Sequence, residues 1–222
     1  MKRSRPLLIG LVSLVLVGSG YALLKSTPDQ VIHQNVSCPT TGGEAPKDVQ
    51  VLGTYRWAKG VVVLYSALCS GHSVTGELQR VLGHQVVKRN GMNWQVGSSD
   101  SYSVSSSKQS AERLIEYGIS QAQEKDGDRY TILYGQFLTP QVSTIEATFD
   151  NGQVLRDSGQ GKAFALIAIG AAHVCDLRIL GPDNQLLRRE DLSQPNSLTL
   201  PKRFVTNSWR SPARCLPIDS NL

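Results

Sequence analysis

Four cysteines carry the clearest chemistry in this chain: Cys38, Cys69, Cys175 and Cys215. No C-x-x-C occurs, and Cys69 with His72 offers only one two-ligand fragment, so we predict no metal site. An even cysteine count is typical of disulfides in an oxidising compartment. Four cysteines allow three pairings. Because neighbours in the chain are the easiest to bring together, we expect Cys38 to pair with Cys69 and Cys175 with Cys215.

The other reactive side chains form no catalytic pattern. We interpret His33, His72, His84 and His173 as surface or strand-end histidines. The segment 71–76, GHSVTG, is one residue longer than the G-x-S-x-G turn that exposes a serine nucleophile. Asp126, Asp128 and Asp150 lie in expected turns, where aspartate is favoured for backbone reasons. No glycine-rich phosphate loop occurs. We therefore predict no catalytic residue and no cofactor.

Two tryptophans, Trp57 and Trp94, are candidates for lining a ligand groove. Both lie near expected hairpin turns, where a bulky side chain can also cap a hydrophobic core. We favour the core role and keep the groove as the alternative.

The N-terminus has the pattern of an export signal. Basic residues at positions 2, 3 and 5 precede an uncharged apolar run over 7–24. As a helix, these 18 residues would reach about 27 Å, close to the thickness of the hydrocarbon core. The positive-inside rule places the rest of the chain outside the cytoplasm. We expect residues 1–25 to be a signal-anchor in the plasma membrane, with a single pass through residues 7–24; a cleaved signal peptide, which would leave a secreted protein, is the alternative.

The charge distribution argues against nucleic-acid binding. The formal net charge is +5, but Lys2, Arg3, Arg5 and Lys25 surround the apolar run. Without these four residues, only one net positive charge remains for residues 26–222. A nearly neutral domain lacks the basic surface that DNA or RNA attracts.

We expect a polar, irregular stalk over 26–48, rich in proline and glycine, followed by a first β-rich half over 49–129. Short apolar runs separated by turn residues predict hairpins around 56–59 and around Asn90-Gly91. The serine-rich segment 97–109 is expected to be a loop. Residues 110–123 have apolar positions at helical spacing and are expected to form the one short helix.

The second half, 130–190, has the clearer strand pattern. Residues 142–149 alternate between apolar and polar, and Asp150-Asn151-Gly152 is a strong hairpin signal. The uniformly apolar AFALIAI over 163–169 predicts a strand covered on both faces. The tail 191–222 is expected to be irregular. The fold class predicted is mainly β: an antiparallel β-sandwich-like ectodomain, or two small β subdomains with one short helix.

Three stretches carry a resemblance to known proteins: GVVVLY at 60–65, GMNW at 91–94, and ILYG at 132–135 leading into 142–149 and the turn at 181–187. Together they resemble a group of secreted or membrane-anchored proteins of Gram-positive bacteria without assigned function. The likeness covers residues 50–188 and implies a location and a β-rich fold. This chain departs from the group in its four cysteines and in its alanine-rich 163–169 segment.

These features favour a membrane-anchored binding or interaction module of the bacterial cell envelope that is not an enzyme. Its partner would be an envelope protein or polymer. The alternative is an envelope hydrolase whose site is not recognisable from sequence. A signalling ectodomain is disfavoured, because the six residues before the apolar run would form a cytoplasmic segment too short to relay a signal.

Overall fold

A computed structural model describes residues 28–36, 38, 45–70, 78–90, 93–104, 113–123, 127–159, 161–193 and 215. The expected membrane anchor therefore lies outside the described residues, as does nearly all of the C-terminal tail. The described part of the chain is mainly antiparallel β, arranged as three sheets with one helix. Within it, no helix has the length and apolar character needed to cross a bilayer.

The first sheet is a meander of four long antiparallel strands, in which each strand pairs with the next in the chain. Its strands are β1 (Lys47–Trp57), β2 (Gly60–Ser70), β3 (Leu78–Asn90) and β4 (Asn93–Ser103). β1 pairs with β2, and β3 pairs with β4, as the two antiparallel hairpins predicted from the sequence. Seven consecutive residues of β2, from Val61 to Ala67, are buried, because both faces of this sheet are covered.

One cover of the first sheet is helix α2 (Pro28–Asn35), where an irregular stalk was predicted; that prediction is wrong. Val31 and Ile32 are buried and pack with Val61 and Val63 of β2. Proline at the first helical position is favourable, because its missing N–H would have no partner in the first turn. The apolar face of a short helix thus closes the outside of the first sheet.

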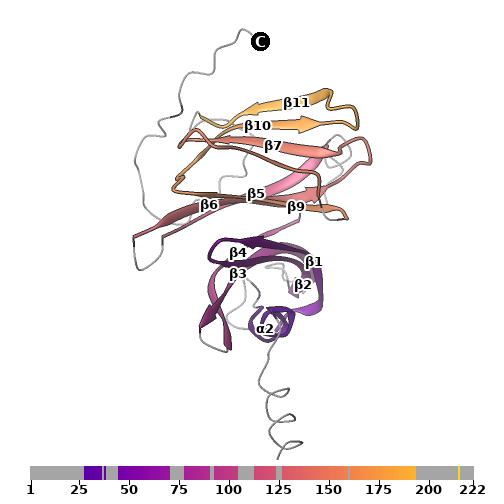
Figure 1. Cartoon of the computed structure of the whole chain (residues 1–222). Coiled ribbons are helices and arrows are strands. Elements are labelled where there is room, and N and C mark those ends of the chain that lie inside the picture. The colour runs from indigo at the N-terminus through magenta and orange to yellow at the C-terminus, as the bar shows by residue number, and fades with distance from the viewer. Residues whose placement is uncertain are drawn as a thin grey trace, which may run out of the picture.

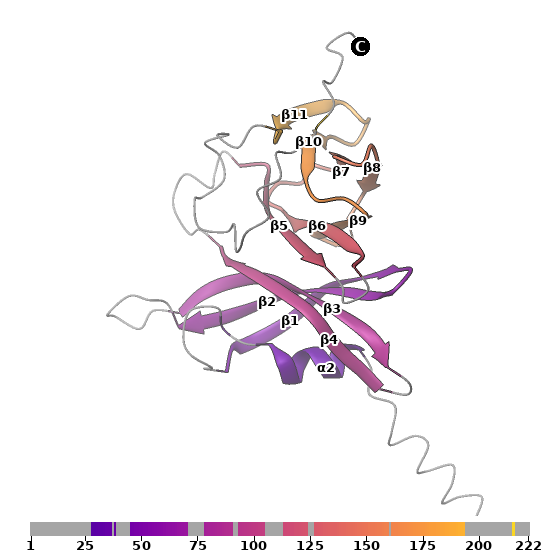
Figure 2. The ribbon, with the colours of Figure 1, turned by 90° about the vertical axis from the view of Figure 1, so that its left-hand side faces the viewer.

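The remaining strands form two further sheets that stack on the first (Figure 1 and Figure 2). The middle sheet has the order β5-β6-β9, with β5 (Ile115–Gln123), β6 (Arg129–Phe137) and β9 (Ala163–Ile169). The outer sheet has the order β11-β10-β7-β8, with β7 (Thr144–Phe149), β8 (Val154–Asp157), β10 (Val174–Leu180) and β11 (Leu186–Asp191). The layers run from α2 through the first and middle sheets to the outer sheet.

The position of the middle sheet explains its uniformly apolar sequence. One core cluster lies between the middle and first sheets and contains Ile132, Tyr134 and Ala165. A second lies between the middle and outer sheets and contains Leu133, Phe164 and Leu166. Alternate residues of β6 and β9 therefore face opposite cores, so both faces of these strands are mainly apolar. Thr131, a buried polar residue of β6, donates its hydroxyl hydrogen to the Ala171 oxygen. The prediction that this strand is covered on both faces is confirmed for residues 163–168, whereas Ile169 at its end is exposed.

Two local predictions are wrong because packing between the sheets decides the structure of these segments. Residues 115–123, expected to be helical, form β5, and residues 97–103, expected in a loop, form the end of β4. Gly118 of β5 lies where the middle sheet packs closely on the first sheet. A Cβ atom at this position would lie 2.8 Å from the Tyr102 ring and 3.0 Å from the Tyr134 ring, so the glycine makes room for two tyrosines between the sheets.

Two disulfides link segments near the two ends of the described chain to the sheets. Cys38, just after α2, is joined to Cys69 of β2, and Cys175 of β10 is joined to Cys215. This is the pairing predicted from the sequence. In the chain-entropy view, closing loops of 31 and 40 residues stabilises the fold by about 4 kcal/mol each. The second bridge holds one point of the C-terminal segment against the outer sheet.

Candidate functional site

An open groove of about 360 Å³ lies along one side of the sheet stack. It forms where the edge strands of all three sheets, β1, β9 and β8, come together. Eight residues line it: Tyr55, Arg56 and Trp57 from β1, Leu155 and Arg156 from β8, and Ala165, Leu166 and Ile167 from β9. The floor is therefore the free edge of the middle sheet, and the walls belong to the sheets on either side.

One end of the groove is closed by two hydrogen bonds that cross between layers. The hydroxyl of Tyr55 donates to the backbone oxygen of Ala163 at 2.8 Å. The carboxylate of Asp157 accepts from the backbone N–H of Ala165 at 2.9 Å. Beyond Ala165, β9 is paired with β6 alone, and at its far end the side-chain amide of Asn151 donates to the backbone oxygen of Ile169 at 2.9 Å.

Trp57 forms part of the wall contributed by the first sheet. Its ring packs on Tyr130 with centroids 4.9 Å apart, and the ammonium of Lys88 lies 5.8 Å from the Trp57 ring centroid. Trp94, the other candidate groove aromatic, packs against the cluster on the α2 side of the first sheet. The structure therefore places Trp57 in the groove and Trp94 on the opposite face.

Two arginines flank the groove, one on each side. Arg156 is held by Glu146 at 3.2 Å and by the side chain of Asn184 at 2.8 Å. Arg56 is exposed on β1, and within the described chain it has no ion-pair partner. None of the eight lining residues is acidic. Arg56 lies opposite Val61 on the α2 side of the first sheet, and Arg156 lies opposite Glu146 on the outer face of the outer sheet. The floor and the inner walls of the groove are therefore apolar and aromatic, and the two arginines flank it.

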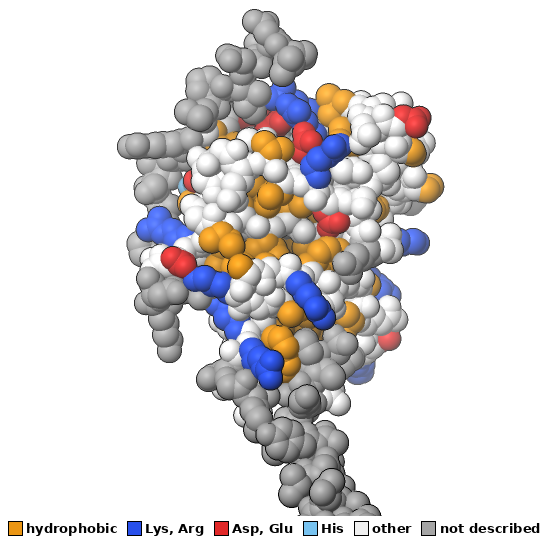
Figure 3. Space-filling view, viewed as in Figure 1, with side chains coloured by type: hydrophobic (Ala, Val, Ile, Leu, Met, Phe, Trp, Pro, Cys, Tyr) orange, Lys and Arg blue, Asp and Glu red, His pale blue; other side chains and the backbone are white. Residues whose placement is uncertain are grey.

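The position of Arg156 is fixed by a line of ion pairs across the outer sheet. Glu146 also accepts from Arg178 at 3.2 Å, and Asp176 accepts from Arg178 at 3.1 Å and from Arg189 at 2.7 Å. Figure 3 shows acidic and basic side chains side by side over this sheet. Asp176 is almost fully buried, at 1% exposure, so its two arginines supply the partners that a buried carboxylate requires.

A second polar cluster is sealed between the first and middle sheets. The ring of His84 is fully buried and stacks near Tyr134, with centroids 4.5 Å apart. Neither ring nitrogen, nor the hydroxyl of Tyr102, has a hydrogen-bond partner among the described residues. Burial lowers the pKa of His84 to about 3 and raises the pKa of Asp100, its cross-strand partner. His84, Tyr102 and Tyr134 are buried, and Asp100 at the edge of the cluster is half-buried.

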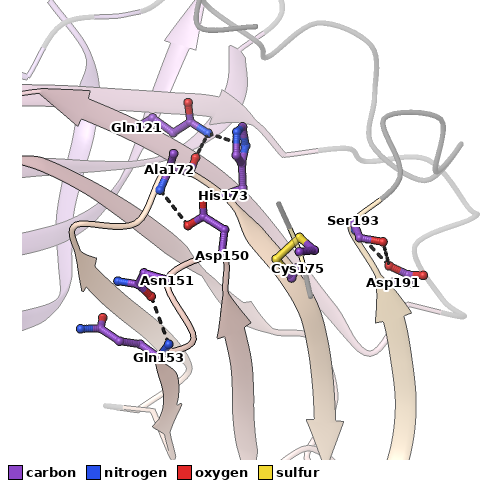
Figure 4. The surroundings of a disulfide bond; sticks show 10 residues. Gln121, Asp150, Asn151, Gln153, Ala172, His173, Cys175, Asp191 and Ser193 are labelled. Carbon is purple, nitrogen blue, oxygen red and sulfur yellow. Dashed lines mark hydrogen bonds between the residues drawn. A yellow bond between two sulfur atoms is a disulfide. The ribbon is translucent and has the colours of Figure 1, made fainter. Parts of the chain in front are cut away.

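The turn around His173 is a structural junction (Figure 4). The side-chain amide of Gln121 donates to the backbone oxygen of Ala172 and lies 3.4 Å from Nδ1 of His173. The Asp150 carboxylate accepts from the backbone N–H of Ala172 at 2.9 Å. These contacts tie β5 of the middle sheet to the connections of the outer sheet, and in them Asp150 bonds to backbone and not to the imidazole.

The remaining histidine and serine candidates from the sequence are not part of a described site. His72, the GHSVTG segment and the side chain of His33 lie outside the described part of the structure. All four cysteines are in disulfides. Within the described part of the chain, no group of three or more His, Cys, Asp or Glu side chains could hold a metal ion.

Sequence reasoning missed Tyr55, Arg56, Leu155 and Arg156 as groove residues. No local signal identifies them, because the groove joins segments that are about a hundred residues apart in the chain.

No known protein family, curated protein or solved structure matches this chain. The resemblance of residues 50–188 to the Gram-positive group therefore stays a prediction, and the function must be argued from the groove.

Proposed function

We propose that this protein is a membrane-anchored recognition module of the bacterial cell envelope, which binds an envelope component in the groove between β1, β9 and β8 and does not turn it over. Residues 7–24 anchor it by a single pass, and a β-sandwich-like domain stands outside the plasma membrane. The N-terminal charge pattern supports export. The two disulfides agree with an oxidising compartment.

The observation that carries the binding role is the groove itself. Its apolar floor is bordered by the aromatic side chains of Tyr55 and Trp57 and by Leu155, and a mainly apolar lining is typical of a recognition site. The polar clusters around His84 and around Asp150 have structural roles. The rings of His84, Tyr102 and Tyr134 are buried in the core, and Asp150 and Gln121 hold backbone in a turn. Binding without chemistry is therefore the function that the geometry favours.

Site-specific photo-crosslinking in growing cells tests this proposal. A benzophenone amino acid replaces Arg56 at the groove, or Lys47 at the other end of the same strand, in the full-length chain. We expect a discrete adduct with one envelope component from position 56 and none from position 47, since the two sites are about 30 Å apart along β1. Equal adducts from both positions, no adduct from either, or release of a cleaved envelope polymer by the purified chain would contradict the proposal.

A further inference from the structure

Helix α2 is the described element that lies nearest in the chain to the expected membrane anchor. The apolar run over 7–24 ends at Leu24, and α2 begins at Pro28. Four residues of fully extended chain span at most about 14 Å. With the apolar run in the bilayer, so short a connection keeps the α2 end of the stack, and not the outer sheet, beside the membrane surface.

The β3–β4 hairpin reaches the same end of the molecule as α2. Figures 1 and 2 both show the end of β3 and the start of β4 turning down beside the helix, to its level in the view. Trp94, the second residue of β4, packs against the cluster that contains Val31 and Ile32 of α2. The helix and this end of the hairpin therefore form one continuous surface.

Arginine and tryptophan side chains lie on this surface. Arg89 is directly opposite Trp94 in the β3–β4 pair, so both side chains point to the α2 side of the sheet. Arg56, opposite Val61, points to the same side, at the border between this surface and the groove. Both arginines are exposed and Trp94 is half-buried. Tryptophan is enriched at membrane–water interfaces, and arginine is attracted to anionic headgroups.

The balance of charge changes along the stack in the same sense. The described residues between 28 and 104, which form α2 and the first sheet, include six basic and three acidic residues. The four strands of the outer sheet carry four basic and five acidic residues. Figure 3 shows more basic than acidic side chains over the lower part of the view, where the first sheet lies. The layer nearest to the anchor is therefore the positive one, which is the orientation that an anionic surface favours.

Building on the anchor in the proposed function, we infer that the surface formed by α2, Arg89 and Trp94, with Arg56 at its border, docks on the anionic headgroups of the membrane that the chain spans. The guanidinium of Arg89 pairs with lipid phosphate, and the Trp94 ring lies at the level of the headgroups. Because the anchor holds this surface close to the bilayer, its effective concentration there is high, and a small number of contacts is enough for docking.

Docking fixes how the groove is presented to the envelope. The middle sheet, which carries the groove floor, lies about 10 Å farther from the bilayer than the first sheet. The groove lies along the edge strands, on one side of the stack. It therefore opens parallel to the membrane, and an envelope component reaches it from the side.

The test measures how close Trp94 lies to lipid. The full-length chain is reconstituted in phosphatidylcholine vesicles with or without phosphatidylglycerol, and lipids with brominated acyl chains serve as the quencher of tryptophan fluorescence. The difference between the wild type and Trp94→Phe isolates the Trp94 signal. We expect Trp94 to be quenched in the anionic vesicles. The ratio of docked to free domains should be at least about fivefold lower in the neutral vesicles, since each arginine near an anionic surface contributes about that factor.

Substitutions of Arg89 separate charge from packing. Arg89→Glu should lower the ratio of docked to free domains at least about fivefold in anionic vesicles, because an attraction becomes a repulsion. Arg89→Lys keeps the charge and should dock like the wild type. Arg113→Glu makes the same charge reversal at an exposed residue just before β5 of the middle sheet, and it should also dock like the wild type.

Three outcomes would overturn the inference. They are equal quenching of Trp94 in the two kinds of vesicle, unchanged quenching in Arg89→Glu, and a protein adduct in place of a lipid adduct from a benzophenone amino acid at position 94 in cells. The last would assign this surface to a protein partner. In each case, a position-56 adduct with an envelope protein or polymer would leave the proposed binding role intact. A chain that does not insert into the vesicles would instead refute the anchor, and with it the proposed function.

Discussion

Acidification is expected to destabilise this fold by about 1.4 kcal/mol per pH unit between pH 6.5 and 3, through His84 alone. The pKa of its ring falls from 6.5 to about 3 because burial excludes the charged form. Below pH 6.5 the unfolded chain binds a proton that the folded chain does not, so stability is fully present above pH 6.5 and decreases as the pH falls. At pH 4.5 the expected loss is about 3 kcal/mol.

The groups that face His84 modify this slope. Asp100 and Tyr102 lie on β4 and Tyr134 on β6, and burial raises the pKa of all three. The raised pKa of Asp100 acts in the opposite direction, since the folded carboxyl takes up its proton at a higher pH than the unfolded one. Asp100 therefore offsets part of the His84 effect in the range just above pH 3.8.

Urea unfolding of the full-length chain between pH 7.5 and 4 measures this slope. His84→Leu removes the titrating ring at similar volume and should remove most of the acid sensitivity. Asp100→Asn should keep the His84 contribution and steepen the fall. If His84→Leu loses stability on acidification as steeply as the wild type, His84 is not a buried neutral histidine between the first and middle sheets.

Gly135→Ala is expected to cost about 3 kcal/mol of unfolding free energy. A Cβ atom at this position of β6 would lie 2.2 Å from the Glu116 oxygen, 2.7 Å from the Phe164 ring and 2.9 Å from the Tyr117 Cα. Two of these contacts are to the backbone of β5, so a side chain cannot rotate away to relieve them. The Tyr134-Gly135 pair thus fills the core on one face of the middle sheet and leaves room for Phe164 on the other.

Gly97→Ala in β4 is the matched control for this substitution. The nearest atom to a Cβ there is 3.5 Å away, which is an ordinary contact. Denaturant midpoints of the two variants should therefore differ clearly, with Gly97→Ala within about 0.5 kcal/mol of the wild type. Equal stability of the two variants would contradict the close packing of β5, β6 and β9 around Gly135.

The features that could be predicted from the sequence are those with a local cause. Asp150-Asn151-Gly152 fixes the β7–β8 turn by its own backbone preferences, and the hairpin is where the sequence predicts it. The apolar run at 163–169 predicts that both faces of the strand are covered, but it does not predict that the first and outer sheets cover them. The cysteine pairing could be predicted because chain neighbours also became neighbours in space.

The wrong predictions arose where packing between layers decides the structure. Leu114, Ile115 and Ile119 satisfy helical spacing, yet Ile115 and Ile119 lie in strand β5, and all three pack against the core between the middle and outer sheets. Helix α2 was missed because its apolar face is only a few residues wide and is stabilised by the first sheet. Pro28, followed by the apolar residues Val31 and Ile32, was the signal that could have identified it.

The candidate site could not be predicted, because no segment contains it. Tyr55 and Ala163, which close its end, are 108 residues apart in the chain. Tyr55, Leu155 and Ile167 line one groove only because the edge strands of three sheets lie on one side of the stack. Trp57 and Trp94 carry equal sequence signals, and the side of the sheet that each occupies is set by strand register.

Export is the claim on which the location, the disulfides and the envelope partner all depend, and thiol trapping with cell fractionation tests it most directly. Cells are quenched in acid, and free thiols are labelled with a maleimide polymer before and after reduction. We predict a membrane-bound chain that takes up no label before reduction and four labels after it. A chain in the soluble cytoplasmic fraction with four thiols that react without reduction would contradict the account.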